Sequence, residues 1–277
     1  MSRFAGWTAL LTGASAGLGA EFARQLAPRL EGGILILTAR RADRLAALAG
    51  ELKAAHPALT LHTFTADLAD PPSVAALGGM LEEAGLRPDL LVNNAGLGDI
   101  GLFETAAPER LDAMLRVNVE ALTVLTRALL PGMVRRGRGT VVNVGSVAGF
   151  LALPTFAVYA ATKAYVNSFS EALAWELKGT GVTVTAVCPG PVPTEFSEVA
   201  YRTPGAGRAM GSPRITRVPA GQAVAESLRA AEKGNLRITP GFVMGLAAFF
   251  TNAAPLWLRR LAYRTTVAQC RAQRKAS

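Results

Sequence analysis

A tyrosine and a lysine four residues apart, Tyr159 and Lys163, are the first residues in this chain whose types and spacing could do chemistry. Residues at positions i and i+4 of an α-helix share a face, so the two side chains would be neighbours. A phenol, with an unperturbed pKa of about 10, is a poor acid-base catalyst near neutral pH, and a positive charge beside it lowers that pKa. Taken alone, the pair could equally be an exposed surface pair.

A glycine-rich segment near the start of the chain has the sequence Thr12-Gly13-Ala14-Ser15-Ala16-Gly17-Leu18-Gly19. It follows an apolar run and opens a predicted helix, which distinguishes a dinucleotide site from a simple turn. Gly13 would allow the tight turn, Gly17 would let the backbone approach the ligand, and Gly19 would let the helix pack closely on the sheet. The free N–H groups of the helix N-terminus would bind the pyrophosphate.

These motifs occur in a fixed order with two others, Asn93-Asn94-Ala95-Gly96 and Ser146. In the order TGxxxGxG, NNAG, Ser and YxxxK, and at this length, the sequence resembles the short-chain dehydrogenase/reductase family. The resemblance extends from about Thr8 to Ile238 and fades in the C-terminal segment. It implies an enzyme that transfers hydride between a nicotinamide cofactor and a carbonyl or alcohol group.

The resemblance implies a role for each matching residue. Tyr159 would donate a proton to the carbonyl oxygen, which Ser146 would hold, and Lys163 would bind the nicotinamide ribose and, with the oxidised nicotinamide, lower the pKa of the phenol. Asn118 would hold a water molecule that links the lysine to solvent; the alternative is a surface asparagine. Asn93 is expected to support the sheet. Cofactor contacts are also implied for Leu18 in the glycine segment, Asp67 at the adenine edge, Asn94, Ala95, Gly96, Pro189, Gly190 and, at the carboxamide, Thr194.

The end of the second predicted strand bears on which dinucleotide binds. An acidic residue there would accept the ribose hydroxyls of NAD, whereas Ala39 is neutral and Arg40 could pair with a 2′-phosphate. Ser15 could add a hydrogen bond to the same phosphate. This favours NADP (NADPH), with the alternative that Arg40 and Arg41 only start a solvated helix.

Short apolar runs alternate with helical patterns along the chain, which predicts a doubly wound, seven-stranded parallel sheet of Rossmann-like α/β type. Ligands of such sheets bind at the carboxyl ends of the strands. The predicted strands are Trp7 to Leu11, Ile34 to Thr38, Leu59 to Thr65, Leu90 to Asn93, Thr140 to Val144, Thr183 to Val187 and Leu236 to Ile238. The predicted helices are 17–29, 42–55, 72–84, 108–131, 156–178 and 219–233.

The chain has 277 residues, of which 50% are hydrophobic, and this composition fits a single domain. We assign residues 1–240 to the cofactor-binding and catalytic domain, with a flexible lid at about 191–218. Residues 241–277 form an extension, first apolar and then basic, that is expected to cover the site or a subunit interface. A membrane-spanning helix at 238–258 is disfavoured because prolines, glycines and polar residues interrupt the stretch.

The formal net charge of +9 does not indicate nucleic-acid binding, because six of the positive charges lie in the last nineteen residues. That basic segment is a candidate contact with an anionic membrane surface. Two cysteines are too few for a disulfide framework and favour a cytoplasmic protein. The two histidines, His56 and His62, lack metal-ligand spacing, so no metal is expected.

Together these features predict an NADPH-dependent carbonyl reductase or alcohol dehydrogenase that acts on a hydrophobic ketone or aldehyde and assembles as a homodimer or homotetramer. A catalytically inactive nucleotide-sensing or scaffold protein of the same fold is one alternative. A reductase of 3-oxoacyl thioesters is another, because the arginines of the lid could favour an anionic substrate. A nucleotide-sugar epimerase would share the tyrosine and lysine but usually has a longer substrate domain.

Overall fold

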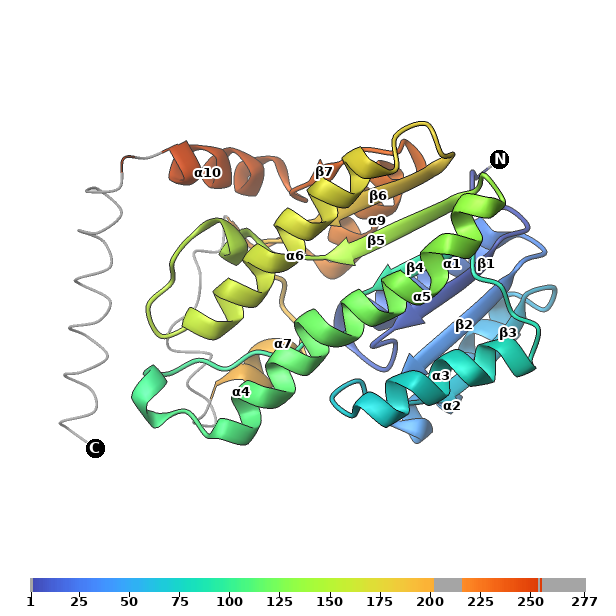
Figure 1. Cartoon of the computed structure of the whole chain (residues 1–277), viewed down its shortest axis with the longest axis horizontal. Helices are drawn as coiled ribbons and strands as arrows, with labels where there is room; N and C mark the ends of the chain where they lie inside the picture. Colours follow the sequence, from blue (N-terminus) through green and yellow to red (C-terminus); the bar gives the residue numbers. More distant parts are fainter. Residues whose placement is uncertain (1, 202–215, 254, 256–277) are drawn as a thin grey trace.

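The computed structural model describes residues 2–201, 216–253 and 255, and these residues build one seven-stranded parallel sheet (Figure 1). The strand order is β3-β2-β1-β4-β5-β6-β7, so the chain builds one half of the sheet outward from β1 and then returns to build the other half. This confirms the predicted doubly wound fold. The strands are β1 (Thr8–Thr12), β2 (Ile34–Ala39), β3 (Thr60–Thr65), β4 (Leu90–Asn93), β5 (Gly139–Val144), β6 (Val182–Val187) and β7 (Arg237–Ile238).

Helices cover both faces of the sheet. The main ones are α1 (Gly17–Leu30), α2 (Ala42–Ala55), α3 (Pro71–Glu83), α5 (Leu122–Arg135), α6 (Ala157–Glu176) and α9 (Ala220–Glu232). Figure 1 shows α3, α5 and α6 across the near face, whereas α1, α2 and α9 pack on the far face. The right-handed crossover of each β-α-β unit places successive helices in this way.

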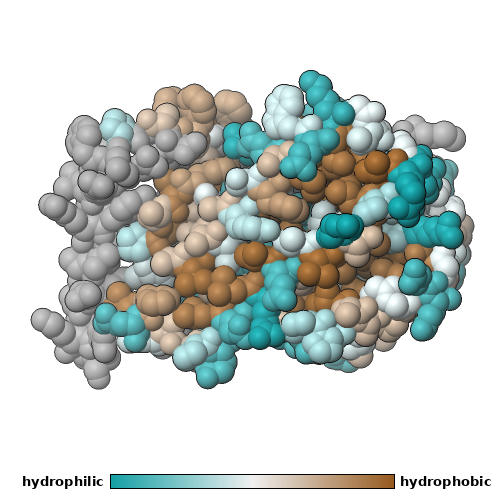
Figure 2. Space-filling view, in the orientation of Figure 1, coloured by the Kyte–Doolittle hydropathy of each residue, from teal (hydrophilic) through white to brown (hydrophobic). Residues whose placement is uncertain are grey.

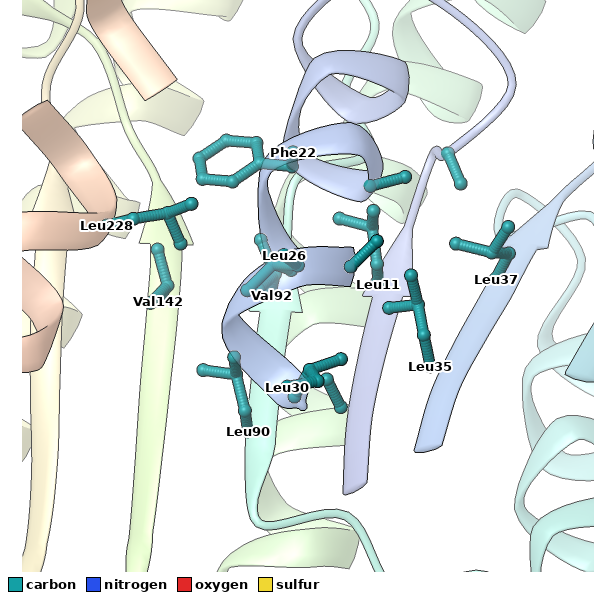
Figure 3. Close-up of a cluster of buried hydrophobic side chains, with 14 of the residues drawn as sticks. Leu11, Phe22, Leu26, Leu30, Leu35, Leu37, Leu90, Val92, Val142 and Leu228 are labelled. Atoms are coloured by element: carbon teal, nitrogen blue, oxygen red, sulfur yellow. The ribbon is translucent and has the colours of Figure 1, made fainter. Parts of the chain in front are cut away.

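The largest buried cluster lies between the sheet and α1. Strands covered on both faces are nearly continuous apolar runs, which is why β1, β2 and β4 are buried along most of their length. β3 differs because it is an edge strand with a mixed burial pattern. Figure 3 shows strand residues facing helix residues in this cluster: Leu11, Leu35, Leu37, Leu90, Val92 and Val142 with Phe22, Leu26, Leu30 and Leu228.

The predicted helix 108–131 is continuous but not uniform. A π-helical turn, η2 (Arg116–Ala121), joins α4 (Pro108–Leu115) to α5. Among the described residues, the combined helix Pro108–Arg135 is the one candidate for a membrane span by length and composition, but its apolar side, including Val117 and Leu125, is buried in the core. π-Turns within α-helices occur frequently at functional sites, and this one contains Asn118.

Two helices in the last third of the chain were not predicted. α7 (Glu195–Ala200) begins within the predicted lid, and α10 (Phe242–Ala253) forms in the apolar segment after Pro240. α10 reaches the catalytic domain through Met244, whose sulfur would lie 2.5 Å from a Cβ atom added to Gly190. Residues 202–215 of the predicted lid and the basic residues 256–277 lie outside the described part of the chain, so the roles assigned to them remain predictions.

Candidate active site

A cavity of about 760 Å³ opens at the carboxyl ends of the strands, where the fold predicts a ligand site. It runs from Arg40 and Asp67 at one end to Tyr159 at the other. Every candidate residue except Asn118 lines it: Gly13, Ser15, Gly17, Leu18, Gly19, Arg40, Asp67, Asn94, Ala95, Gly96, Ser146, Tyr159, Lys163, Pro189, Gly190 and Thr194. The fold therefore gathers residues that lie up to 181 positions apart in the sequence, from Gly13 to Thr194.

The glycine segment forms the cavity wall beside α1. Gly13 has a φ of +66°, a left-handed conformation that glycine adopts without strain. A Cβ on Gly19 would clash with the Gly13 carbonyl, so the loop closes tightly on the first turn of the helix. The residue before α1 is Ala16, which provides no side-chain cap. The N–H groups of the first helical turn are therefore available for an anion.

Asn94 fixes this loop from the end of β4. Its Nδ2 atom donates to the carbonyl oxygens of Thr12 (2.9 Å) and Gly13 (3.2 Å). The Thr12 hydroxyl accepts hydrogen bonds from the backbone N–H groups of Asn94 and Ala95. Asn93 instead supports the sheet, since its Nδ2 atom donates to Thr126 and Asn143. The NNAG segment thus joins the cofactor loop to the centre of the sheet.

Tyr159 lies in the first turn of α6 and is 8% exposed. Its ring stacks on Phe156 with 4.1 Å between the ring centroids and packs at a tilt against Phe196. Burial raises the pKa of Tyr159 to about 12, and a hydrogen bond with Ser146 opposes the shift. The direction is opposite to the lowered pKa expected from Lys163, because desolvation of the phenolate is the larger cause and the Ser146 hydrogen bond is the one that opposes it.

Lys163 lies one helical turn further on and is 4% exposed. Its ammonium group donates a hydrogen bond of 2.7 Å to the carbonyl oxygen of Val144, at the end of β5. Burial lowers the pKa of Lys163 to about 8. Since both side chains are buried and face the cavity, the alternative of an exposed surface pair is excluded.

Ser146 is the N-cap residue of the short 3-10 helix η3 (Val147–Phe150), which follows β5. Its Oγ atom accepts a hydrogen bond from the Ala148 N–H at 3.1 Å and lies 3.4 Å from the Pro189 carbonyl oxygen, to which it donates. Asn167 of α6 holds the Ser146 backbone through a hydrogen bond to its carbonyl oxygen. The hydroxyl is thereby fixed beside the Tyr159 phenol.

Asn118 is fully engaged with the protein rather than exposed. Its Oδ1 atom accepts from the Leu97 N–H (2.8 Å), and its Nδ2 atom donates to the Leu97 carbonyl (2.9 Å) and to Thr162 (3.0 Å). A Cβ on Gly96 would lie 3.5 Å from both Asn118 Oδ1 and Lys163 Nζ. Asn118 therefore holds the loop after β4 that borders Lys163, and the surface alternative is wrong. Its contact with a water molecule stays a prediction.

The end of the cavity beside β2 contains a residue that was not among the candidate site residues. Arg41, rather than Arg40, contacts Ser15, with Nε and Nη2 at 3.4 and 3.2 Å from the hydroxyl oxygen. Both arginines line the cavity and are exposed. The pair Arg40-Arg41 in the sequence indicated an arginine at this position, but it could not show which of the two side chains contacts Ser15.

The other end of the cavity is apolar and was also missed. The described residues near Tyr159 that line it are chiefly Leu97, Ile100, Leu151, Leu153, Pro154, Phe156, Phe196 and Val199. The charged residues in the described lining are Arg40, Arg41, Asp67, Lys163 and Glu195. The run Phe150-Leu151-Ala152-Leu153-Pro154 between the serine and the tyrosine could have indicated this apolar end.

The cleft fits a dinucleotide and a carbonyl compound end to end. An uncapped helix N-terminus suits the pyrophosphate, the arginines suit a phosphate, and Ser146 with Tyr159 offers two hydroxyl groups to one oxygen atom. In the described part of the chain, no group of three or more His, Cys, Asp or Glu side chains is placed to hold a metal ion.

The short chain dehydrogenase family model matches residues 7–204. The chain is 40% identical over 198 residues to sulfoacetaldehyde reductase 2 of Chromohalobacter salexigens, an alignment that covers 69% of this chain and 74% of that protein. It is 40% identical to an NADP-dependent 3-hydroxy acid dehydrogenase of Salmonella typhi over 70% of this chain and 76% of that protein.

Solved structures show the same similarity. A short-chain dehydrogenase from Sphingobium yanoikuyae in complex with NADPH superposes with a TM-score of 0.76 at 31% identity, over 90% of this chain and 96% of that chain. A bulky-bulky ketone specific alcohol dehydrogenase from Comamonas testosteroni superposes with a TM-score of 0.74 at 30% identity, over 89% and 91% of the two chains.

Proposed function

The chain belongs to the short-chain dehydrogenase/reductase family, and from this membership we propose that it is an NADPH-dependent carbonyl reductase for bulky hydrophobic ketones or aldehydes, reversible as an alcohol dehydrogenase. One observation carries the proposal: a buried, protonated phenol, hydrogen-bonded to Ser146, stands in an apolar chamber beside Lys163. The presence of all three groups in one site argues against an inactive scaffold.

In this proposal Tyr159 supplies the proton. With a pKa of about 12 the phenol stays protonated at neutral pH, as a proton donor to a developing alkoxide must. Ser146 positions the carbonyl oxygen by a hydrogen bond, and Lys163 supplies a positive charge one helical turn away. Bound NADPH would supply the hydride to the carbonyl carbon.

The preference for NADPH rests on charge at the end of β2. Ala39 leaves this position without an acidic side chain, and Arg40 and Arg41 bring two guanidinium groups to the cavity. Arginine pairs with a phosphate through two parallel N–H groups, whereas an acidic residue would repel it. The relatives named as NADP-dependent or solved with NADPH support the same choice.

The preference for hydrophobic substrates rests on the chamber around Tyr159. A small anionic substrate, such as that of the sulfoacetaldehyde reductase, needs a cation to bind its sulfonate or carboxylate. Among the described residues at this end of the cavity, Lys163 is the one cation, and its ammonium is bound to Val144. A bulky ketone instead needs apolar contact area, which Leu153, Phe156 and Phe196 provide.

We also propose a cytoplasmic homodimer or homotetramer. Figure 2 shows apolar side chains gathered on the face that carries α5 and α6. Large apolar side chains of α4, α5 and α6 are exposed: Leu115, Val124, Tyr165 and Trp175. Exposed apolar patches of this kind mark interaction surfaces. Contact of the basic C-terminal residues with a membrane remains a prediction.

The test is the reduction of a panel of carbonyl compounds, measured as the decrease in NADPH absorbance. Bulky aryl and alicyclic ketones should be reduced with a kcat/KM at least about tenfold above that for sulfoacetaldehyde and for short 3-oxo acids. Higher activity on the anionic compounds would contradict the hydrophobic assignment. NADPH binding without turnover of any carbonyl compound would favour the sensing alternative.

A further inference from the structure

Glu195 forms an ion pair across the mouth of the cavity. It is the first residue of α7, directly after β6 and the Pro189–Thr194 segment, and its two carboxylate oxygens each lie 2.9 Å from Nη1 of Arg44 in α2. One of them is also 3.5 Å from Nη1 of Arg41. These contacts connect the catalytic half of the chain to the end of β2.

The Arg41 guanidinium group is shared between the two walls of the cavity. Its Nε and Nη2 atoms face the hydroxyl of Ser15 in the glycine segment, while Nη1 faces Glu195. A 2′-phosphate at this end would require the same N–H groups and the same hydroxyl. Arg41 cannot give its full set of donors to a phosphate and keep Glu195 as a close partner.

We propose that Glu195 determines cofactor specificity by competing with the 2′-phosphate of NADP for Arg41. This role rests on the proposed NADPH-dependent function and assigns to the cofactor site a residue that no sequence motif marks. The carboxylate occupies Arg41 before the cofactor binds and must be displaced from it by the 2′-phosphate, so Glu195 limits the advantage of NADP over NAD. NAD lacks this phosphate, so its binding depends much less on whether Arg41 leaves Glu195.

Electrostatics supports the proposal. Hydrogen bonding from Arg44 holds the pKa of Glu195 below its usual range, so the carboxylate is charged at neutral pH. Glu195, Arg41 and Arg44 are all about half exposed, so each ion pair is weak enough to be exchanged for a phosphate. Salt should weaken the competition because it screens exposed charges.

Loss of the Glu195 carboxylate should not release α7. Two other contacts hold this helix, one from the loop after β4 and one from α4: the Ile100 N–H donates to the Ala200 carbonyl at 2.8 Å, and Arg110 donates to the Val199 carbonyl at 2.9 Å. Arg110 is itself fixed by an ion pair with Asp99 at 3.0 Å. A Glu195→Gln variant therefore keeps the helix in place while it removes the charge.

The test is a fluorescence titration of the full-length protein with NADPH and with NADH, which measures binding without turnover. Glu195→Gln should tighten NADPH binding by about threefold to tenfold and change the Kd for NADH by less than about twofold. Glu198→Gln is the matched control, because Glu198 is exposed on the same helix and does not line the cavity. In an Arg41→Gln background, Glu195→Gln should have little effect on NADPH.

The opposite results would overturn the proposal. Weaker binding of both cofactors by Glu195→Gln would show that the residue closes over the dinucleotide instead of competing with it. An equal gain for NADPH and NADH, or a gain that persists in the Arg41→Gln background, would show a general charge effect. If the wild-type protein binds neither cofactor, the proposed function itself is wrong.

Discussion

The Nζ atom of Lys163 lies 5.7 Å from the ring centroid of Tyr159, over the face of the ring. Burial shifts the two groups in opposite directions, raising the pKa of the phenol to about 12 and lowering that of the ammonium to about 8. Near neutral pH the pair is thus a neutral phenol beside a charged amine, which is the state needed to reduce a carbonyl group. The amine is the group that loses its proton first as the pH rises.

The rate of carbonyl reduction should therefore fall as the pH rises through about 8, because Lys163 becomes neutral while Tyr159 remains protonated. Below that value the pair contributes no further pH dependence, since both groups keep their protons. The measurement is kcat/KM for a ketone with saturating NADPH between pH 6 and 10. Lys163→Arg keeps the charge, so whatever activity it retains should lack the decline. A wild-type profile that is flat to pH 10 would contradict the assignment.

Arg40→Asp should reverse the cofactor preference. The substitution removes a phosphate partner and adds a charge that repels the 2′-phosphate, so the ratio of kcat/KM for NADPH to that for NADH should fall by about tenfold to a hundredfold. Arg87→Asp is the control, because Arg87 is exposed and precedes β4 at the opposite end of the sheet. Equal use of both cofactors by the wild-type protein would show that Arg40 is only a surface residue.

Asn118→Ala should lower both stability and activity. It removes three hydrogen bonds and leaves the backbone N–H and C=O groups of Leu97 unpaired, which should reduce the free energy of unfolding by about 3 kcal/mol. Because the Gly96–Leu97 segment borders Lys163, kcat should fall as well. Asn235→Ala, at an exposed asparagine, should change the free energy of unfolding by less than about 0.5 kcal/mol. The measurement is denaturant unfolding. If Asn118→Ala lowers the free energy of unfolding no more than Asn235→Ala does, this positioning role is contradicted.

Truncation after Pro240 should raise KM for hydrophobic ketones or dissociate the oligomer, while NADPH binding is retained. Two substitutions in α10 separate these outcomes. Met244 packs on Gly190, so Met244→Ala should raise KM by a few fold if α10 covers the site. Phe242 is 86% exposed, so Phe242→Ser should change the assembly measured by light scattering if α10 is an interface. Unchanged kinetics and assembly in the truncated protein would indicate an independent anchor.

Much of the fold could be predicted from the sequence because it depends on local patterns. Apolar runs of three to seven residues, most of them followed by helical periodicity, gave the strands and most helices close to their observed bounds, and the glycine segment indicated the position of the cleft. α10 was not predicted because a short apolar stretch interrupted by glycine has no clear period. The π-turn at Asn118 was missed because an extra residue in a helical turn leaves no mark in composition.

The rest of the site depends on contacts between distant residues. Arg44 and Glu195 are 151 positions apart, and no spacing rule pairs them. The raised pKa of Tyr159 also follows from the tertiary structure, because Phe156 and Phe196 exclude water from the phenol. The sequence suggested that Lys163 would lower this pKa, but it could not show that burial raises it.

Tyr159→Phe tests the central claim most directly. The variant lacks only the phenol oxygen, so the folded protein should still bind NADPH with a Kd within about twofold of wild type, while kcat for ketone reduction should fall by about a thousandfold. Tyr165→Phe is the matched control, because Tyr165 lies on the same helix, exposed and hydrogen-bonded to Thr123, and should keep wild-type turnover. The decisive measurement is single-turnover NADPH oxidation with a bulky ketone. Loss of oxidation in Tyr159→Phe with retained NADPH binding is the predicted result, and substantial oxidation by the folded Tyr159→Phe variant would contradict the account.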